Sequence, residues 1–282
     1  MRGTALSSPS QALLLPLVVV LLLASSIPAV VADGTVWATP HDSYSSSVGV
    51  LGCKINTDRV AYWPGSVDCN NLCISLSYDD GVNNKRTVKL LRVDQSQGAH
   101  DVSYDAWNYL YTGNSAKDLP VAGGPLPMQY AELPADECRS LLRTKDKTLA
   151  LSASNSMNFL ASCLAQPDSW VAKNYALYNV LDSICSWGYD ESCKLDWPAA
   201  NQPTCKHSLG MPVGLKDAPV YNVQYPSGDV VDASTGEKVS SPGHSTSLAA
   251  PTPTRNGGPG RVAMALLMAG SLLWTYLVQG SC

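Results

Sequence analysis

Alternating hydrophobic and polar positions predict β-structure in the region that follows residue 33. Residues 74–78 (Ile-Ser-Leu-Ser-Tyr) alternate with a period of two, as in a strand with one buried face, and Asp79-Asp80-Gly81 supplies turn residues after it. Residues 87–93 form a second candidate strand that can pair with the first, and residues 128–131 form a candidate closing strand. We therefore expect a β-domain over residues 33–142.

One helix is expected inside this β-domain. Ser103 is a suitable N-cap for a helix over residues 104–110, and Gly113 is a suitable residue to end it.

The hydrophobic period changes after residue 142. Residues of one helical face recur at Met157, Leu160 and Leu164. After a break at Pro167, a second helical face is marked by Trp170, Leu177, Leu181 and Ile184. Four cysteines also fall in this region, so we expect a small helical, disulfide-linked extension over residues 143–210.

We expect the chain to be less ordered after residue 210. Residues 221–236 have weak strand character, and residues 240–256 are rich in Ser, Thr, Pro and Gly. Such a composition buries too little apolar surface to offset the chain entropy. We assign residues 211–256 to a disordered, O-glycosylated stalk.

The N-terminus has the pattern of a secretory signal peptide. Arg2 precedes a continuous apolar run over residues 12–24, and Val30 and Ala32 are small residues before a cleavage site at Asp33. The alternative is an N-terminal membrane anchor, for which the run is short, because about 20 apolar residues are needed to span a bilayer. We expect residues 1–32 to be removed.

The C-terminus has the pattern of a glycosylphosphatidylinositol (GPI) signal. A second apolar run covers residues 262–278, and small residues and a short polar spacer precede it. Asn256 is the first choice for the attachment residue, and Ser247 is the alternative with the longer spacer. Residues 257–282 would then be removed, and the mature chain would be held by lipid on the outer face of the cell membrane, or in the cell wall. A single-pass helix is the competing interpretation.

Charge and composition exclude some partners. Lys and Arg number 19 against 23 Asp and Glu, and no basic stripe is interleaved with aromatic residues, so we expect no nucleic-acid partner. The 13 Tyr and 7 Trp, with a single Phe, suit an extracellular protein with a surface that faces polysaccharide. We expect a monomer.

The cysteine count agrees with both terminal assignments. The chain has nine cysteines, and Cys282 would leave with the GPI tail. Eight would remain for four disulfides, which form in an oxidising compartment: Cys53, Cys69, Cys73, Cys138, Cys163, Cys185, Cys193 and Cys205. Zinc bound by Cys205 and His207 is the alternative, but no Cys-x-x-Cys pair supports it, so we expect no metal and no cofactor.

Three segments carry a resemblance to a known group of proteins. They are Cys-Asn-Asn-Leu-Cys at 69–73, Val-Lys-Leu-Leu-Arg-Val-Asp-Gln-Ser at 88–96, and Gly-Ala-His-Asp-Val-Ser at 98–103. In this order the chain resembles the double-psi β-barrels of the cerato-platanin, barwin and expansin type over about residues 34–142. Two departures are the three residues between the paired cysteines, where barwins have two, and Ser96, where barwins have a cysteine.

The resemblance implies a mainly β fold, a six-stranded double-psi β-barrel, in a protein of a walled organism such as a filamentous fungus. By analogy with cerato-platanins it implies the bridges Cys53–Cys69 and Cys73–Cys138. The other four cysteines would then pair among themselves in the helical extension.

Two acids are the candidates for catalysis. Asp101 matches a polysaccharide-facing acid of the expansins and related glycoside hydrolases, and Asp94 matches the catalytic acid of related bacterial cell-wall lyases. Glycoside hydrolysis needs two such carboxyl groups. Cerato-platanins carry a non-acidic residue at the Asp101 position and are regarded as non-catalytic carbohydrate binders. Purely structural roles are the further alternative, Asp101 at the helix start and Asp94 at a strand end.

The sequence therefore favours a non-enzymatic cell-surface protein that binds wall polysaccharide, such as chitin or β-glucan, in a shallow barrel groove. Asp94, His100 and Asp101 would line the groove, with Tyr62 and Trp63 as stacking platforms. Trp63 is expected to be exposed because it precedes Pro-Gly. A hydrolase that uses Asp101 and Asp94, and an inert display or adhesion scaffold, are the alternatives.

Overall fold

A computed structural model describes residues 33–82 and 84–239 of the chain. The predicted signal peptide, residues 240–256 of the assigned stalk, the attachment candidates Asn256 and Ser247, and the predicted GPI signal lie outside the described residues. The residues that are described belong to one compact unit. Within them, no helix is long and apolar enough to cross a membrane.

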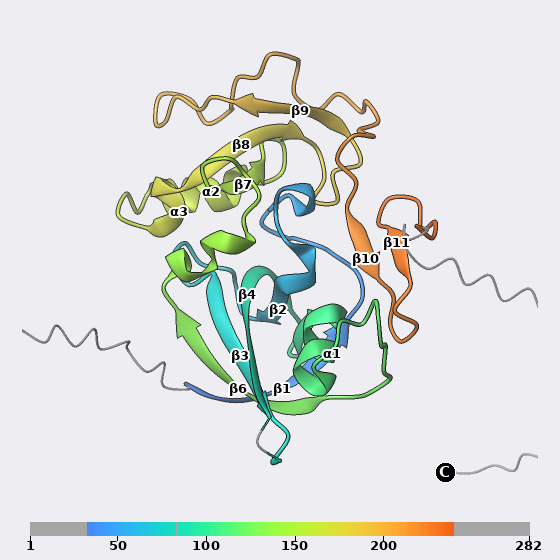
Figure 1. The fold of residues 1–282 in the computed structure, drawn as a ribbon. Helices are drawn as coiled ribbons and strands as arrows, with labels where there is room; N and C mark the ends of the chain where they lie inside the picture. The colour runs from blue at the N-terminus through green and yellow to red at the C-terminus, as the bar shows by residue number, and fades with distance from the viewer. Residues whose placement is uncertain (1–32, 83, 240–282) are drawn as a thin grey trace, which may run out of the picture. The chain divides into compact units, whose positions relative to one another are not determined.

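Six strands close into a barrel, which forms the lower half of Figure 1. The order around the barrel is β1-β5-β2-β4-β3-β6, with parallel pairs β1/β5 and β2/β4 and antiparallel pairs elsewhere. The strands are β1 (Gly34–His41), β2 (Val60–Pro64), β3 (Cys73–Asp79), β4 (Lys85–Ser96), β5 (His100–Ser103) and β6 (Leu126–Leu133). The mainly β fold with a six-stranded barrel is confirmed, and the two strands predicted on either side of the Asp-Asp-Gly turn pair as β3 and β4.

Helix α1 (Tyr104–Thr112) packs against the barrel and is the helix that the sequence predicts. It ends at Gly113, whose φ of 85° is easy for glycine and costly for other residues. Trp107 is fully buried, and its Nε1 donates a hydrogen bond of 3.1 Å to the Ala38 carbonyl on β1. A Cβ atom at Gly123 would lie 2.2 Å from the Trp107 ring, so only glycine allows this close approach.

The extension after residue 142 contains a sheet as well as helices. The strands β7 (Leu149–Ser152), β8 (Tyr175–Val180) and β9 (Gly188–Cys193) form a three-stranded sheet beside α2 (Met157–Leu164) and α3 (Trp170–Lys173). The first predicted helix is confirmed as α2. The second is wrong beyond residue 173, because α3 ends after one turn and Leu177 then pairs in parallel with Leu151 as part of β8.

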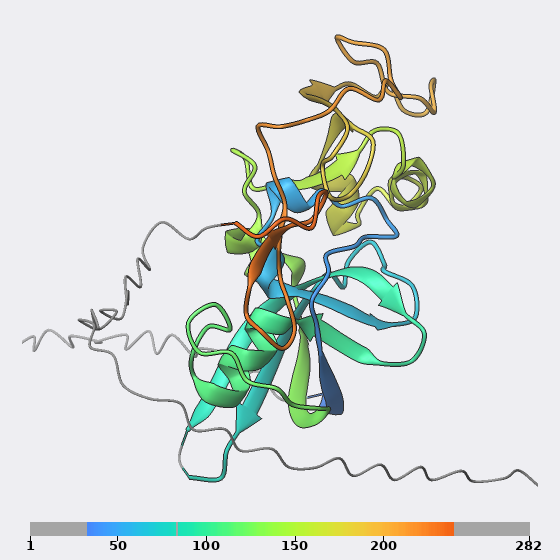
Figure 2. The same cartoon turned by 90° about the vertical axis from the view of Figure 1, so that its right-hand side faces the viewer.

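A short hairpin follows where the sequence analysis placed the beginning of the stalk. It consists of β10 (Tyr221–Val223) and β11 (Val230–Asp232), and it lies beside α1 in Figure 2. The Tyr225 ring lies 5.1 Å from that of Tyr104, and its hydroxyl donates a hydrogen bond of 2.6 Å to the Gly123 carbonyl. The ordered chain therefore extends at least to residue 239.

Short 3₁₀ turns complete the described chain: η1 (Gly52–Lys54), η2 (Thr57–Arg59) and η3 (Ala135–Leu141).

Four disulfides connect the eight cysteines expected to be bonded. Cys73–Cys138 is confirmed, but the expected Cys53–Cys69 pair is wrong, and so is the expectation that the other four cysteines pair only among themselves. Cys53 is bonded to Cys185, Cys69 to Cys163, and Cys193 to Cys205. Two bridges thus join the barrel to the extension.

One hydrophobic core is shared by the barrel and the extension. It includes Leu91 of β4 together with Leu151, Leu160 and Leu177 of the extension. A second core fills the space between the inner barrel face and α1, and contains Leu76, Leu90 and Trp107. Strand β2 contributes residues to both cores.

Candidate functional site

Four neighbouring strands bring polar side chains into one row across the barrel. Thr39 of β1 pairs with Asp101 of β5, Asp101 pairs with Tyr62 of β2, and Tyr62 pairs with Asp94 of β4. Directly opposite residues place their side chains on the same face of a sheet. A register shift between Ala61 and Tyr62 is what aligns Tyr62 with Asp94. We call Thr39, Asp101, Tyr62 and Asp94 the cross-strand row.

The two candidate acids have different surroundings within this row. Asp101 is half-buried and accepts a hydrogen bond from the Thr39 hydroxyl. Asp94 is only 8% exposed, and its carboxylate accepts hydrogen bonds from the Ser45 hydroxyl at 2.7 Å and the Gln95 amide at 2.8 Å. Two strand spacings separate their Cα atoms, about 10 Å.

Tyr62 fills the space between the two acids. It is 4% exposed, and its hydroxyl donates a hydrogen bond of 3.1 Å to the Ser43 carbonyl. Burial raises the pKa of Tyr62, and the carboxylates of Asp94 and Asp101 raise it further, so the phenol stays protonated. Because the Tyr62 ring is almost fully buried, it has no open face on which a sugar could stack.

Trp63 is also buried, at 6% exposure, so its expected exposure is wrong. The reason is that both faces of β2 are covered. Val60 and Tyr62 belong to the core shared with the extension, and Ala61 and Trp63 to the core inside the barrel. The Trp63 ring contacts His100 edge-on, with 4.9 Å between ring centroids.

His100 directly precedes Asp101 on β5 and is half-buried, and its side chain lies on the opposite face of the sheet from the row, against Trp63. Burial lowers the pKa of His100 below its ordinary value of 6.5, although the neighbouring Asp101 acts in the opposite direction. The imidazole is therefore neutral at pH 7 and offers one hydrogen-bond donor and one acceptor.

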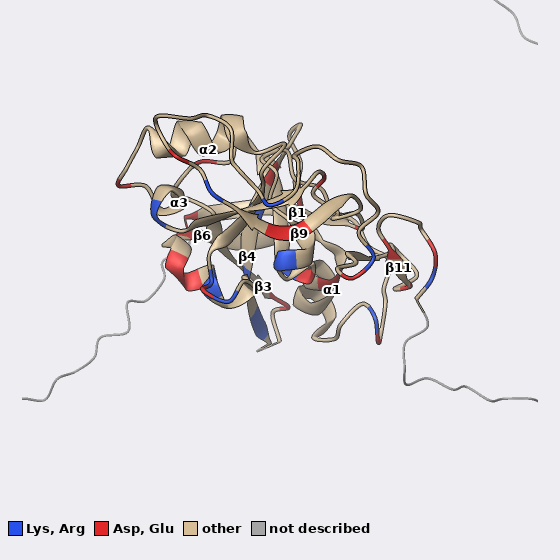
Figure 3. Cartoon of the chain, turned by 90° about the horizontal axis from the view of Figure 1, so that it is seen from above, with Lys and Arg blue, Asp and Glu red and all other residues tan. Residues whose placement is uncertain are grey.

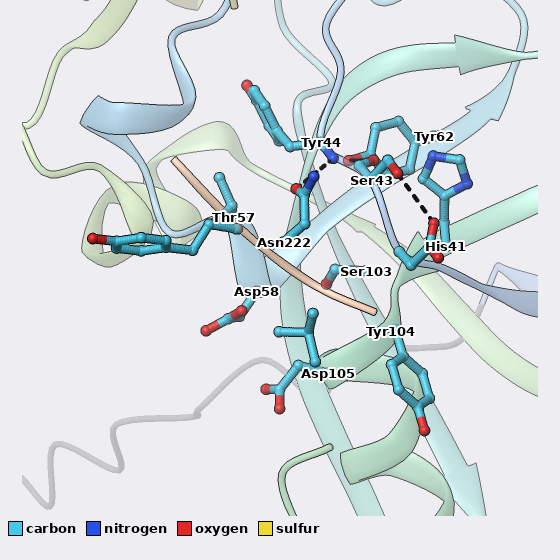
Figure 4. Close-up of a pocket in the computed structure, with 13 residues that line it drawn as sticks. His41, Ser43, Tyr44, Thr57, Asp58, Tyr62, Ser103, Tyr104, Asp105 and Asn222 are labelled. Carbon is cyan, nitrogen blue, oxygen red and sulfur yellow. Dashed lines mark hydrogen bonds between the residues drawn. The ribbon is translucent and has the colours of Figure 1, made fainter. Parts of the chain in front are cut away.

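A small hollow, the barrel pocket, lies beside the row and is shown in Figure 4. His41, Ser43, Tyr62 and Ser103 form part of its lining, and the His41 ring lies 4.6 Å from that of Tyr62. Its open volume is about 250 Å³, solvent space included. This volume is small for a small-molecule site. Sequence reasoning missed its lining because Asn222, from the hairpin, completes it by accepting a 2.9 Å hydrogen bond from the Tyr44 amide.

A largely buried ion pair lies beside the barrel pocket, which Asp105 lines. Arg59 donates to Asp105 at 2.8 Å, and the Asp105 carboxylate also accepts hydrogen bonds from the Ser115 hydroxyl and the Ala116 amide. Burial raises the pKa of Asp105, but the bonds from Ser115 and Arg59 outweigh it, so the net direction is downward. Asp105 is 4% exposed, which keeps this pair from being screened like a surface pair.

Replacing Asp105 should remove an acid-sensitive part of the stability. A carboxyl group with a lowered pKa in the folded state stabilises it above the unfolded pKa of about 4, and this contribution is lost as the pH falls through the folded pKa. We expect Asp105→Asn to cost about 2 kcal/mol at pH 7 and less at pH 3, measured by urea unfolding. The exposed Asp118→Asn is the control. An unchanged Asp105→Asn deficit at pH 3 would show that the charge of Asp105 is irrelevant.

The residues considered for zinc have other partners. Cys205 is bonded to Cys193, and His207 Nδ1 lies 2.7 Å from Glu191 Oε2. Over residues 33–82 and 84–239, no cluster of three or more His, Cys, Asp or Glu side chains could hold a metal ion. Figure 3 shows Lys and Arg interspersed with Asp and Glu over the described ribbon.

The chain has a distant likeness to a solved structure. No family model matches the sequence, and no curated protein matches it. The crystal structure of cerato-platanin 2 from M. perniciosa is similar at 17% identity and a TM-score of 0.28, over 37% of this chain and 98% of that one. The barrel fold rests on the strand order described above.

Proposed function

We propose that this protein is a non-catalytic, extracellular polysaccharide-binding protein of the cell surface or cell wall, held by a GPI lipid at Asn256. Its ligand would be a neutral β-linked wall glycan such as chitin or β-glucan. The observation that carries the proposal is the cross-strand row, in which four strands align hydrogen-bonding side chains over one strip of the barrel. The four disulfides support an oxidising, extracellular compartment.

The groups that can reach a glycan are the half-buried ones. Thr39 and Asp101 keep part of their surface open to solvent on the face of the row, and His100 and the exposed Gln95 lie on the opposite face, beside Trp63. A carboxylate, a neutral imidazole, a hydroxyl and an amide complement the hydroxyl and acetamido groups of a sugar chain. Asp94, Tyr62 and Trp63 would act from below, as positioning residues that hold the strands in register.

The same geometry argues against hydrolysis. Glycosidases place two carboxyl groups across an open cleft, about 5 to 9.5 Å apart, with the sugar between them. Here the phenol of Tyr62 occupies the space between Asp94 and Asp101, and Asp94 is buried and hydrogen-bonded to Ser45. A sugar ring has no route between the two acids in this arrangement.

Replacing Asp101 tests the proposal. We expect the wild-type chain to sediment with insoluble chitin or β-glucan and Asp101→Asn to bind about tenfold more weakly, because a hydrogen bond to a charged group is lost. Asp146→Asn, an exposed acid in the extension, is the matched control and should bind like the wild type. Thermal unfolding of each variant checks the fold.

Reducing sugar is assayed in the same tubes. Release that Asp101→Asn abolishes would replace the binding proposal with a hydrolase. Wild-type protein that neither sediments with any of the glycans nor releases sugar would leave a display scaffold.

A further inference from the structure

A second hollow continues the barrel pocket past the hairpin. Thr57, Asp58 and Tyr221 line both hollows, and Lys117 and Arg143 line only the second. The second hollow has an open volume of about 350 Å³, solvent space included. Together they form one channel between the barrel and the start of β10, which we call the hairpin groove. The cross-strand row touches it only at Tyr62.

One end of the hairpin groove contains a hydroxyl without a partner. Ser103 is 7% exposed and lines the barrel pocket, and its Oγ makes no hydrogen bond with any residue that the structure describes. Figure 4 shows Ser103 among the lining side chains, between those of Asn222 and Tyr104. A buried polar group without a partner is costly and uncommon in native proteins. A hydroxyl group of a bound molecule would satisfy it.

An aromatic ring stands where the two hollows meet. Tyr221 lines both hollows and is 42% exposed, so part of its ring is accessible from the groove. A half-exposed phenol in a groove with polar walls suits a sugar ring, whose C–H face packs on the aromatic face while its hydroxyls reach the walls.

The other end of the hairpin groove has an unbalanced positive charge. Asp58 and Lys117 form an ion pair at 2.5 Å and neutralise each other. Arg143 is exposed, and among residues 33–82 and 84–239 no side chain or carbonyl accepts a hydrogen bond from its guanidinium. Its backbone amide is fixed by a 2.8 Å bond to the Lys54 carbonyl. A guanidinium presents two parallel donors that match a carboxylate.

We propose that the hairpin groove binds a glycan segment that carries a carboxylate, a uronic-acid sugar. The carboxylate pairs with Arg143, the sugar ring packs on Tyr221, and a hydroxyl group of the neighbouring sugar reaches Ser103. This goes beyond the neutral-glycan function proposed above, because the ligand class and the side chains that contact it are different.

The test uses the full-length, disulfide-bonded chain and an α-1,4-linked oligogalacturonate, with the fully methyl-esterified oligomer as the uncharged control. Calorimetric titration should show binding of the acid form at least about fivefold tighter than the ester, and added salt should weaken it. Arg143→Gln should lower affinity for the acid form about five- to tenfold and leave the ester unchanged.

Tyr221→Ala should weaken both forms by up to about tenfold, because it removes the packing surface. Tyr111→Ala is its matched control, since Tyr111 is 40% exposed and lies on α1 outside both hollows. Arg143→Gln, at an exposed side chain, keeps the test valid if Tyr221→Ala fails to fold.

Three results would overturn the proposal: no binding of the acid oligomer, equal affinity for the acid and the ester, or equal losses in Tyr221→Ala and Tyr111→Ala. The neutral-glycan proposal is tested separately with the same variants. Arg143→Gln should sediment with chitin or β-glucan like the wild type, and Asp101→Asn should bind oligogalacturonate like the wild type.

Discussion

The double variant Cys69→Ala/Cys163→Ala is expected to lower the free energy of unfolding by about 4 to 5 kcal/mol. The bridge spans a sequence separation of 94 residues, so it removes much conformational freedom from the unfolded chain. It also pins the extension to the barrel where the two share a core, and both sulfur atoms are buried there. Urea unfolding of the oxidised chain, followed by tryptophan fluorescence, measures the loss.

The Cys193–Cys205 bridge supplies the matched control. It closes a separation of only 12 residues within the extension, so Cys193→Ala/Cys205→Ala should cost about 2 kcal/mol less than the first double variant. Equal losses from the two double variants would mean that loop length does not determine the contribution of these bridges. A larger loss from the short loop would contradict the role assigned to the Cys69–Cys163 bridge.

The second large effect is expected from Trp107→Ala, which should cost about 3 to 5 kcal/mol. The side chain is fully buried between α1 and the barrel, and its loss opens a cavity next to Gly123 that rigid backbone cannot fill. It also leaves the Ala38 carbonyl without its hydrogen bond from Nε1. Because Ala38 directly precedes Thr39, glycan sedimentation should weaken as well.

Trp37→Ala is the control for this variant. Trp37 lies on the same strand as Ala38 but is 62% exposed, so its replacement should change the free energy of unfolding by no more than about 0.5 kcal/mol. Thermal or urea unfolding of both variants gives the comparison. A Trp107→Ala variant as stable as Trp37→Ala would show that α1 is not held by this ring.

The elements that the sequence predicts well are those with local causes. The alternation over residues 74–78 and the Asp-Asp-Gly turn specify the β3–β4 hairpin without reference to the rest of the chain. Gly113 likewise ends α1, and the helix begins directly after Ser103 as predicted, although the Ser103 hydroxyl makes no capping hydrogen bond. The positions of Asp94 and Asp101 on strands near one another follow from the barrel resemblance, and the row adds their register through Tyr62.

The wrong expectations have long-range causes. Leu177 fits a helical face and a strand equally well, and its pairing with Leu151 decides between them. The partner of Cys69 depends on where the extension packs: the Val171 amide donates to the Cys69 carbonyl at 3.0 Å, which brings Cys163 close. Trp63 looked exposed because nothing in its local sequence reveals that β2 is covered on both faces.

The hairpin groove could not be predicted from the sequence, because its residues also come together only through long-range packing. Arg143 and Tyr221 lie in parts of the chain without a shared pattern, and only the return of the chain past η2 places them on one hollow. Tyr221 itself fell within the assigned stalk, where no packing was expected.

The shared core has a consequence for how this protein can be rearranged in evolution. A chain that ended at Leu142 would leave Cys53 and Cys69 as free thiols and open the apolar surface around Leu51 and Ile55 to water. The barrel is therefore not a portable module. Gene fusion or truncation that preserves the fold must carry the barrel and the extension together, as a single heritable unit.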